Sequence, residues 1–485
     1  MRNIVLFGAA CVCTVGMIAV SGPCGAQDAP GLECPPSQIP MFSASIDGQP
    51  LTLHTFSAGS FAIFAAVKPA MIEIHAGFDL RWVVIRPLSA NVLPVIAANH
   101  RDIRIPITGV TPLTVEFNND LDHVLHLFPY KPEGNEPQAG DAHVRYFGPG
   151  VQEAGLIEMK SGETVYLAPG AWVRGMIHAR DADHIAILGP GVLDASGIAN
   201  DNAPYGGNSP IYLERTLGAR IQGVTIFDSR AWTVHLRQAD GTRIDGIRIL
   251  NPDPRFGHDG IDIDSSSHVV VENFFVRTND DGVVVKNLAD VDTSDIRVAH
   301  AVVWNMPNGG NGLEIGFENR AHAIHDVRFE DIDLIHVEHG AAMSIHDGDS
   351  GTIENITYEN IRVEDARRRL VDFAIVYAPY GTDRPATDAE VRDRMDRGGA
   401  WDAILCYLPD EKAALISRRG HIRNVVVRNL RVVAGAMPYS VVAGFDTEHS
   451  VDNVVLEGLS YQGIPIRDAA SGKLVTEYAS GLVLR

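Results

Sequence analysis

The chain has 485 residues, with 61 acidic side chains against 40 lysines and arginines and a formal net charge of −21. This acidic balance argues against nucleic acid or an anionic membrane surface as a partner. The length is enough to bury a large core, in two or three domains.

The first 26 residues predict a secretory signal peptide. Arg2 supplies a positive charge, an apolar run follows as far as Val20, and small residues lead to a cleavage site after Ala26. We therefore expect a periplasmic or secreted protein, with no membrane insertion once the signal is removed. The mature chain would keep Cys34 and Cys406, and an oxidising compartment permits but does not require their pairing.

Residues 36–129 predict a small antiparallel β-sandwich. Apolar residues alternate with polar ones over 41–46, 51–56, 71–74, 82–85 and 113–117, and Asp47-Gly48 marks a turn. The stretch 130–143, rich in Pro and Gly at its start, is the expected linker to the rest of the chain.

Beyond the linker a short phrase recurs: an apolar residue, two polar or small residues, then alternating apolar residues. Its copies begin at Ile187, Ile221, Ile244, Val271, Val298, Phe329, Tyr358, Val427 and Leu456. The steps between them run from 23 (244 − 221) to 34 (221 − 187) residues, except for one step of 69 (427 − 358). Such a period indicates a solenoid, whose coils bury their apolar side chains by stacking on one another.

The alternation within each copy, with Gly and Asn at the corners, fits strands and turns better than helical repeats. We therefore predict an all-β protein: a right-handed parallel β-helix over residues 144–485, preceded by the small antiparallel β-sandwich. The long step predicts an insertion at about 364–420, with aromatic residues at Tyr377, Tyr380, Trp401 and Tyr407. These rings either line a sugar site or belong to a lid that touches no ligand.

Three aspartates lie within the repeat. Asp280 and Asp281 are adjacent and are followed by Gly282, and Asp259 precedes Asp280 by 21 residues (280 − 259). Cleavage of a glycosidic bond needs one carboxylic acid to protonate the leaving oxygen and others to activate water. Crowded carboxylates also raise one another's pKa, which keeps one of them protonated. Turn carboxylates or a calcium site are the alternative interpretation.

The sequence around these acids, at residues 258–263 and 279–286, resembles the polygalacturonase-like glycoside hydrolases of the pectin lyase-like superfamily. That family carries an Asn-Thr-Asp-Gly motif and an Asp-Asp motif one coil later. The likeness covers about residues 144–459, and a sandwich before a β-helix additionally resembles the related dextranase and isopullulanase group. The resemblance implies an inverting enzyme in which Asp280 is the general acid, while Asp259 and Asp281 position and deprotonate the water.

Two motifs of that family differ in this chain. Its Gly-His-Gly motif falls on residues 310–312, so Asn311 takes the histidine position. Its Arg-x-Lys motif, which holds the substrate carboxylate, falls on Ser344-Ile345-His346, so both basic residues are missing. Because an arginine fork grips a carboxylate most strongly, their absence argues against galacturonic acid as the substrate.

Several more side chains beside the aspartates, or at a similar phase of the next coils, are candidates to bind the sugar. They are His258, Lys286, Asn311, Glu314 and His346. The alternative for each is an ordinary strand or turn residue. Asn273, Asn360 and Asn429 recur at one coil position, and we assign them to a structural ladder. No metal or cofactor is expected, because no Cys/His cluster with metal-ligand spacing occurs.

Together these features predict a glycoside hydrolase that cleaves an α-glycosidic bond in a poly- or oligosaccharide by acid/base catalysis. Two alternatives stay open. A polysaccharide lyase uses the same fold, usually with a calcium-neutralised uronate and a Lys or Arg base. A non-catalytic, carbohydrate-binding surface β-helix is the other, although a binder has no need of three aspartates at this spacing.

Overall fold

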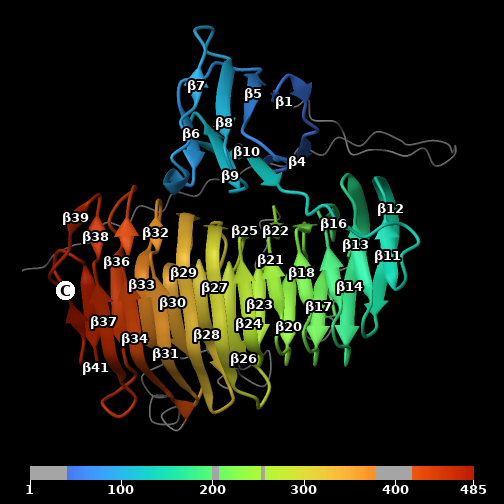
Figure 1. Cartoon of the computed structure of the whole chain (residues 1–485). Coiled ribbons are helices and arrows are strands. Elements are labelled where there is room, and N and C mark those ends of the chain that lie inside the picture. The colour runs from blue at the N-terminus through green and yellow to red at the C-terminus, as the bar shows by residue number, and fades with distance from the viewer. Residues whose placement is uncertain (1–40, 199–206, 253–256, 377–417) are drawn as a thin grey trace, which may run out of the picture. The chain divides into compact units, whose positions relative to one another are not determined.

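The computed structural model describes residues 41–198, 207–252, 257–376 and 418–485. Residues 41–485 form one compact unit. Its strands make two five-stranded sheets and one sheet of 32 strands, and η1 (Leu88–Ala90) is a single 3-10 turn (Figure 1). The predicted all-β class is confirmed. The predicted signal peptide, both cysteines of the mature chain and the four aromatic residues of the insertion lie outside the described residues.

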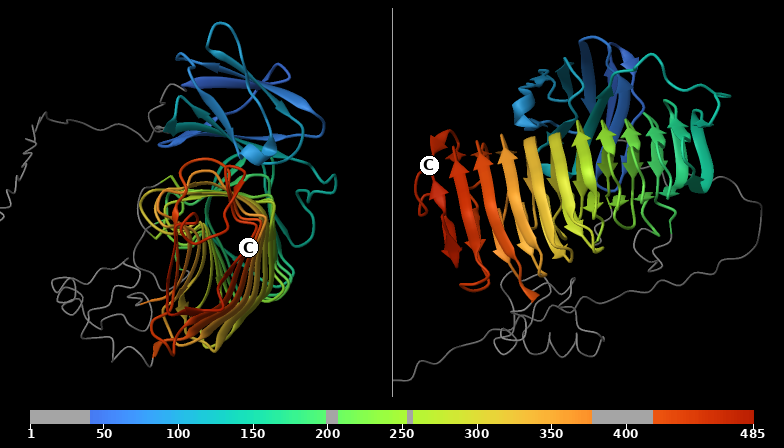
Figure 2. Two further views of the ribbon diagram at one scale, coloured as in Figure 1. Left: turned by 90° about the vertical axis from the view of Figure 1, so that its left-hand side faces the viewer. Right: turned by 60° about the horizontal axis from the view of Figure 1, so that its bottom comes forward.

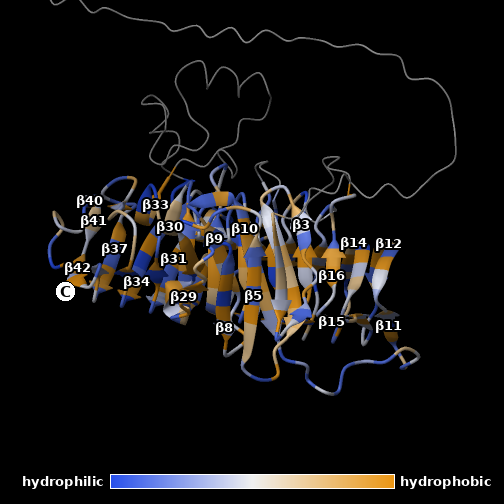
Figure 3. Cartoon of the chain, turned by 90° about the horizontal axis from the view of Figure 1, so that it is seen from above, coloured by the Kyte–Doolittle hydropathy of each residue, from blue (hydrophilic) through white to orange (hydrophobic). Residues whose placement is uncertain are grey.

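The two small sheets enclose a core of their own. Their orders are β2-β1-β5-β8-β7 and β3-β4-β10-β9-β6. The strands are β1 (Phe42–Ile46), β2 (Gln49–Pro50), β3 (His54–Phe56), β4 (Gly59–Ala65), β5 (Ala70–Ala76), β6 (Val83–Arg86), β7 (Val95–Ile96), β8 (Asp102–Ile107), β9 (Leu113–Phe117) and β10 (Asp120–Tyr130). Alternate residues of β5, such as Ile72 and Ile74, enter the core, and this alternation appears as colour bands in Figure 3.

One pairing in the sandwich differs from the fully antiparallel prediction. Strands β4 and β10 pair in parallel, with Gly59 opposite Val124 and Ala65 opposite Tyr130. Parallel neighbours need a long connection, and five strands of the chain lie between these two. The sequence patterns did not predict either of these strands.

The large sheet is the predicted β-helix, and Figure 2 shows its stacked coils along the axis and from the side. Each coil contributes to three parallel ladders. The first ladder contains β11 (Val144–Phe147), β13 (Thr164–Leu167), β15 (Ala186–Leu188), β18 (Arg220–Gln222), β21 (Arg243–Asp245), β24 (Ser267–Glu272), the first parts of β27 (Thr293–Asn305) and β29 (Ala323–Val337), then β31 (Thr352–Glu359), β34 (His421–Arg428), β37 (Val451–Glu457), β41 (Ala479–Ser480) and β42 (Val483–Leu484).

The second ladder contains the first halves of β12 (Gly150–Met159) and β14 (Ala171–Arg180), then β16 (Val192–Asp194), β19 (Thr225–Phe227), β22 (Arg248–Leu250), β25 (Phe275–Thr278), the last parts of β27 and β29, β32 (Arg362–Val363), β35 (Arg431–Val432) and β38 (Ser460–Tyr461), which pairs with β39 (Ile464–Pro465). The third contains the second halves of β12 and β14, then β17 (Ile211–Glu214), β20 (Val234–Arg237), β23 (Ile261–Asp264), β26 (Val283–Asn287), β28 (Leu313–Asn319), β30 (Ala341–Asp347), β33 (Arg369–Ile375), β36 (Tyr439–Ala443) and β40 (Leu474–Glu477).

The predicted repeat matches the strand register residue by residue. The first residues of successive copies pair directly: Ile187 with Ile221, Ile221 with Ile244, Ile244 with Val271, Val271 with Val298, Val298 with Phe329, Phe329 with Tyr358, Tyr358 with Val427 and Val427 with Leu456. These residues stack along the interior of the solenoid, where all are buried. One apolar residue per coil therefore sets the register of the first ladder.

The long step is real, but the range predicted for the insertion began too early. Tyr358 pairs with Val427, so 69 residues separate neighbouring strands of this ladder. Within the predicted range 364–420, however, β33 pairs with β30 and β36 as part of the third ladder. The repeated phrase occurs only in strands of the first ladder. A strand of the third ladder, such as β33, therefore lacks the phrase and was included in the predicted insertion.

Asparagines at the corners carry the left-handed backbone that the tight turns require. Asn273, Asn360 and Asn429 have φ values of 57°, 56° and 54°. The side-chain amide of Asn429 donates to Asn360 Oδ1 at 3.0 Å. For this pair the predicted structural ladder is confirmed.

The sandwich packs on the second ladder through aromatic residues and a buried arginine. Phe61 and Phe128 belong to the same buried cluster as Phe275 and Trp304. Arg277 stacks 4.0 Å above the Trp304 ring and donates to the backbone carbonyl of Ala58 at 2.8 Å. The guanidinium thus has a hydrogen-bond acceptor despite its burial, which offsets the cost of removing it from water.

Candidate active site

The third ladder carries the acidic residues on its outer face. Ile261 and Ile263 of β23 point into the coil interior, so Asp262 and Asp264 between and after them point outward. The register continues this outer row across five coils: Asp262, Val284, Glu314, Ser344 and Asp372 pair in succession. Side chains from well-separated parts of the chain therefore line up in one row on the outer face of this ladder.

Asp259 and Asp281 occupy equivalent places just before their strands. Gly260 N donates to Asp281 O at 2.8 Å, and Gly282 N donates to Asn311 O at 2.9 Å. A Cβ on Gly260 would lie 2.2 Å from the Gly282 carbonyl oxygen, and one on Gly282 would lie 2.5 Å from that of Gly312. The glycine after each aspartate is therefore required by the close stacking of the coils.

Asp280 is held by backbone donors. Its Oδ2 accepts from Gly257 N at 2.7 Å, and its Oδ1 accepts from Asp281 N at 3.1 Å. Asn305 Nδ2 donates to the backbone carbonyl of Asp280 at 2.9 Å. A Cβ on Gly310 would lie 2.2 Å from the backbone between the two aspartates, so the next coil packs directly against this pair.

Asp281 is fixed by the asparagine that stands at the family's histidine position. Asn311 donates to Asp281 Oδ1 from its backbone N at 2.7 Å and from its side-chain amide at 3.1 Å. The same amide donates to Glu314 Oε2 at 2.9 Å. Asn311 thereby links the aspartates to the next polar group along the ladder.

Burial is the largest cause that raises the pKa of all three aspartates. It brings the pKa of Asp280 to about 6, although hydrogen bonds from Gly257 and Asp281 oppose the shift. The pKa values of Asp259 and Asp281 lie well above the usual value, because neighbouring carboxylates add to the effect of burial. The exposed fractions are 3% for Asp259, 7% for Asp280 and 8% for Asp281, so the last two are the more accessible.

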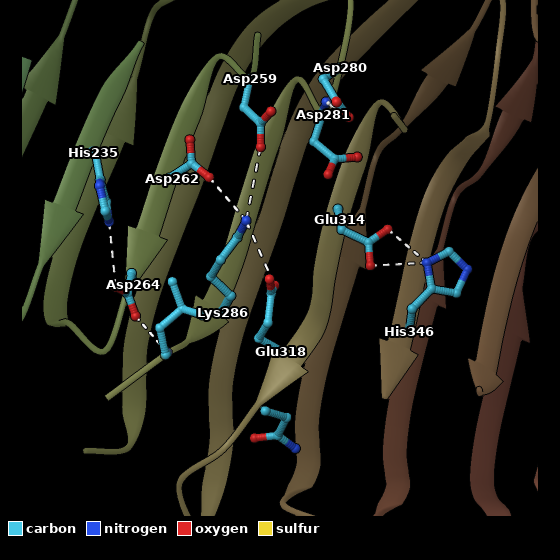
Figure 4. Close-up of polar contacts among 12 residues, drawn as sticks. His235, Asp259, Asp262, Asp264, Asp280, Asp281, Lys286, Glu314, Glu318 and His346 are labelled. Atoms are coloured by element: carbon cyan, nitrogen blue, oxygen red, sulfur yellow. Dashed lines mark hydrogen bonds and ion pairs between the residues drawn. The ribbon is translucent and has the colours of Figure 1, made fainter. Parts of the chain in front are cut away.

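Lys286 points at carboxylates. Its Nζ lies 3.2 Å from Asp262 Oδ1, 3.9 Å from Asp259 Oδ2 and 3.9 Å from Glu318 Oε2 (Figure 4). It also lies 3.9 Å above the Trp232 ring. Burial alone would lower the pKa of Lys286, but the surrounding carboxylates raise it well above its usual value.

A second polar group occupies the next coils. His346 Nδ1 lies 3.0 Å from both carboxylate oxygens of Glu314, and its Nε2 lies 3.4 Å from Asp372 Oδ2. Ser344 Oγ donates to Glu314, and Phe317 stacks on the His346 ring. Burial alone would lower the pKa of His346, but the carboxylates of Glu314 and Asp372 raise it to about 10.

The predicted site residues thus separate into groups by their contacts. The three aspartates lie on adjacent coils, Lys286 and Asn311 contact them, and Glu314 and His346 contact each other. His258 is buried beside Asp259, and its backbone carbonyl accepts a hydrogen bond from the Thr278 hydroxyl. The sequence patterns missed four participants: Trp232, Asp262, Glu318 and Asp372. For Asp262 the sequence did contain an indication, since this residue lies at an outward position of the strand that follows Asp259.

Other features of the described residues do not add a site near the aspartates. Searching those residues for groups of three or more His, Cys, Asp or Glu that could hold a metal ion finds none. A cavity of about 480 Å³ lies elsewhere, between residues 130–138 and strands β13, β15 and β18. In the same described ranges, no helix is long and apolar enough to cross a membrane.

Comparisons with known proteins match part of the β-helix to one family. Residues 158–393, just under half of the chain, match the model of glycosyl hydrolases family 28. The polygalacturonase of Fusarium fujikuroi is 27% identical over 41% of this chain and 57% of its own length. The probable endopolygalacturonase D of Neosartorya fischeri is 27% identical over 49% of this chain and 55% of its own. The chain thus spans about half the length of these curated relatives.

Among solved structures, Dex49A from Penicillium minioluteum has a similar fold. It is 16% identical, with a TM-score of 0.61 over 86% of this chain and 83% of its own. This likeness extends beyond the matched family segment and includes most of the described residues. The predicted resemblance to the polygalacturonase-like glycoside hydrolases is confirmed, and the comparisons support a glycoside hydrolase.

Proposed function

Because the coils are related to glycosyl hydrolases of family 28, we propose that this protein is an inverting glycoside hydrolase whose catalytic residues are Asp259, Asp280 and Asp281. The observation that carries the proposal is the gathering of these three carboxylates on adjacent coils, with every pKa raised. Groups that exchange protons near neutral pH are the ones that acid/base catalysis requires.

Asp280 acts as the general acid. Its pKa of about 6 leaves it protonated in mildly acidic solution, so it can donate to the glycosidic oxygen as the bond breaks. Asp259 and Asp281 take the proton of the attacking water. The three carboxylates are crowded, so the protons belong to the cluster, and substrate binding decides which oxygen carries each one at the moment of reaction.

The base needs an ionised carboxylate on the opposite side of the sugar from the acid. Inverting glycosidases separate the two carboxyl groups by about 6.5–9.5 Å to admit a water molecule. No covalent glycosyl-enzyme forms in this reaction. The sugar is therefore released with its anomeric configuration inverted, as the β-anomer from an α-linked substrate.

The substrate is a neutral, or differently decorated, poly- or oligosaccharide. Where the family has Arg-x-Lys, this chain has Ser344 and His346, and both are bound to Glu314. A uronate at this place would meet the carboxylates of Glu314 and Asp372, with His346 already engaged by both. The names of the relatives support the reaction class, while this group of residues argues for a different sugar.

The lyase alternative requires a base that abstracts a proton from a uronate. Lys286 is a poor base here, because the surrounding carboxylates hold its pKa well above the usual value. A non-catalytic carbohydrate binder also fits less well, since burying three carboxylates in one cluster is costly unless their protons are used.

The test is a reducing-end assay over a panel of α-linked polysaccharides, followed by proton NMR of the first minutes of reaction on the best substrate. We expect a neutral glycan to be cleaved faster than unsubstituted polygalacturonate, and the first product to be the β-anomer. A retained anomer would mean that an aspartate attacks the sugar directly. An unsaturated, ultraviolet-absorbing product would identify a lyase.

A further inference from the structure

The catalytic aspartates belong to a larger group of buried carboxylates. Asp262 and Glu318, neither of which the proposed reaction uses, have 0% and 7% of their surface exposed. Burial raises the pKa of both. Five neighbouring carboxyl groups therefore compete for protons, and a base among them works only if something keeps it ionised.

Lys286 is placed to do so. It enters from β26, between β23, which follows Asp259 and carries Asp262, and β28, which carries Glu318. Figure 4 shows its ammonium between these three carboxylates, all within 4 Å. The Trp232 ring covers it at 3.9 Å, which keeps the ammonium in place and excludes water.

The neighbouring Asp264 shows that this is a selective arrangement. Asp264 is the direct strand partner of Lys286, yet its Oδ2 pairs with Arg237 at 2.6 Å and with His235 at 3.4 Å. Leu288 N donates to its Oδ1 at 2.7 Å. Asp264 thus has its own cation in Arg237, and the charge of Lys286 is directed to the side where Asp259 lies.

The remaining charged groups near Lys286 are Asp280, Asp281 and Glu314. Asp280 and Asp281 bind backbone and amide donors, and Glu314 is paired with His346. Among the three proposed catalytic aspartates, it is Asp259 that forms an ion pair with Lys286 in the contacts described.

We propose that Lys286 is a positioning residue of the reaction proposed above: its ammonium favours the ionised form of Asp259 against burial and the neighbouring carboxylates, so that Asp259 can accept the proton of the attacking water. Asp262 and Glu318 hold the ammonium in place and balance its charge. Lys286 therefore acts through Asp259 and does not bind the sugar, in contrast to the role predicted from the sequence.

The test compares the pH dependence of kcat/KM for variants that change the charge beside Asp259 in opposite directions. Lys286→Met removes the cation, so Asp259 ionises less readily, and we expect the acidic limb of the profile to move up by about one pH unit or more. Asp262→Asn removes a negative neighbour of Asp259 and should move the same limb down. Lys286→Arg keeps the charge and should restore most of the wild-type profile.

Lys473→Met is the matched control. Lys473 also lies over an aromatic ring, 5.2 Å from the centre of Tyr439, and donates to a backbone carbonyl at 2.7 Å, but on a distant coil. We expect no shift of the limb in this variant. A merely structural role of Lys286 would lower the rate in both Lys286→Met and Asp262→Asn without moving their limbs in opposite directions, and that result would overturn the proposal.

A second measurement separates this proposal from the proposed function. Carbon-13 NMR of labelled aspartate carboxyls, with Asp259→Asn used to assign the signal, follows the ionisation of Asp259 without any substrate. Its midpoint should rise in Lys286→Met even if no glycan is cleaved. If Lys286→Met does not fold, Asp262→Asn must still lower the midpoint, and an unchanged midpoint there would overturn the role of Lys286.

Discussion

Two polar clusters lie side by side on one face of the same ladder, and they handle charge differently. In the first, Asp259, Asp280 and Asp281 share a neighbourhood with Lys286, and carboxyl groups outnumber the cation that contacts them. In the second, His346 stands between Glu314 and Asp372. The first cluster can therefore gain and lose protons in the pH range where enzymes work.

The second cluster holds its protons. With a pKa of about 10, His346 remains an imidazolium from acidic to neutral pH, and Ser344 and Asn311 donate to the same glutamate. Such a cluster offers a fixed pattern of hydrogen-bonding groups instead of a movable proton. Under the proposed function the first cluster performs the chemistry, whereas the second is a buried network with fixed charges.

The largest expected effect is on catalysis in the first cluster. Asp280→Asn should reduce kcat about 10²–10⁴-fold on the best substrate, because an amide cannot deliver a proton to the leaving oxygen. The control is Asp194→Asn, which changes another buried aspartate that accepts from the Trp172 indole at 2.7 Å, on a distant coil. Both variants should keep the wild-type circular dichroism spectrum, and near wild-type turnover in Asp280→Asn would contradict the assignment.

A smaller but clear effect should appear in the stability of the second cluster. His346→Gln leaves Glu314 buried without its cation, whereas Asp372 keeps its ion pair with Arg369. Breaking a buried pair by removing one partner typically costs about 3–5 kcal/mol of unfolding free energy. Urea unfolding measures it. His268→Gln is the matched control, because His268 pairs with Asp240 at 2.6 Å on the exposed surface, where solvent weakens the pair and little loss of stability is expected. Equal losses in the two variants would mean that His346 is not a buried counterion.

The third prediction separates the clusters by pH. The pKa of Asp280 rises from 3.8 to about 6 on folding, so its stabilising contribution is complete below pH 3.8 and is lost as the pH rises through 6. His346 contributes stability that is complete below pH 6.5 and is lost only as the pH approaches 10. Between pH 4 and 6 stability therefore depends on the ionisation of Asp280 and hardly on that of His346.

Urea unfolding of the wild type over that window should show stability falling by roughly 2–3 kcal/mol through Asp280 alone. Asp280→Asn should flatten the slope, whereas His346→Gln should leave it unchanged. The opposite outcome, a slope that disappears with His346 and persists without Asp280, would exchange the roles assigned to the two clusters.

Much of this could be predicted from the sequence, and the reasons are physical. Each coil places one apolar residue at the same interior position, so the copies that begin at Ile187 and end at Leu456 define the register of the first ladder. The adjacent Asp280 and Asp281, one coil after Asp259, were enough to place the acids together. These predictions depended on the period of the sequence repeat, which the stacking of the coils imposes.

What was missed depends on contacts that the period does not encode. Strands β4 and β10 pair in parallel across a long connection, so no short-range pattern marks them. Glu318 reaches Lys286 only after the register shifts between β26 and β28. Asp372 lies in the segment assigned to the insertion. The sequence placed Lys286 on the correct face of its strand. Which carboxylates its ammonium contacts, however, depends on the charged side chains of three strands together.

The glycines that follow Asp259, Asp281 and Asn311 also have a consequence for how this architecture can change. Gly260, Gly282 and Gly312 allow successive coils to stack without spacing, at the strand separation of about 4.8 Å found in β-sheets. The distance between two functional groups on this face is therefore a whole number of coils. Substitutions on one coil can alter the sugar that is recognised without altering the separation of acid and base, whereas inserting a coil between Asp259 and Asp280 would change it in one step.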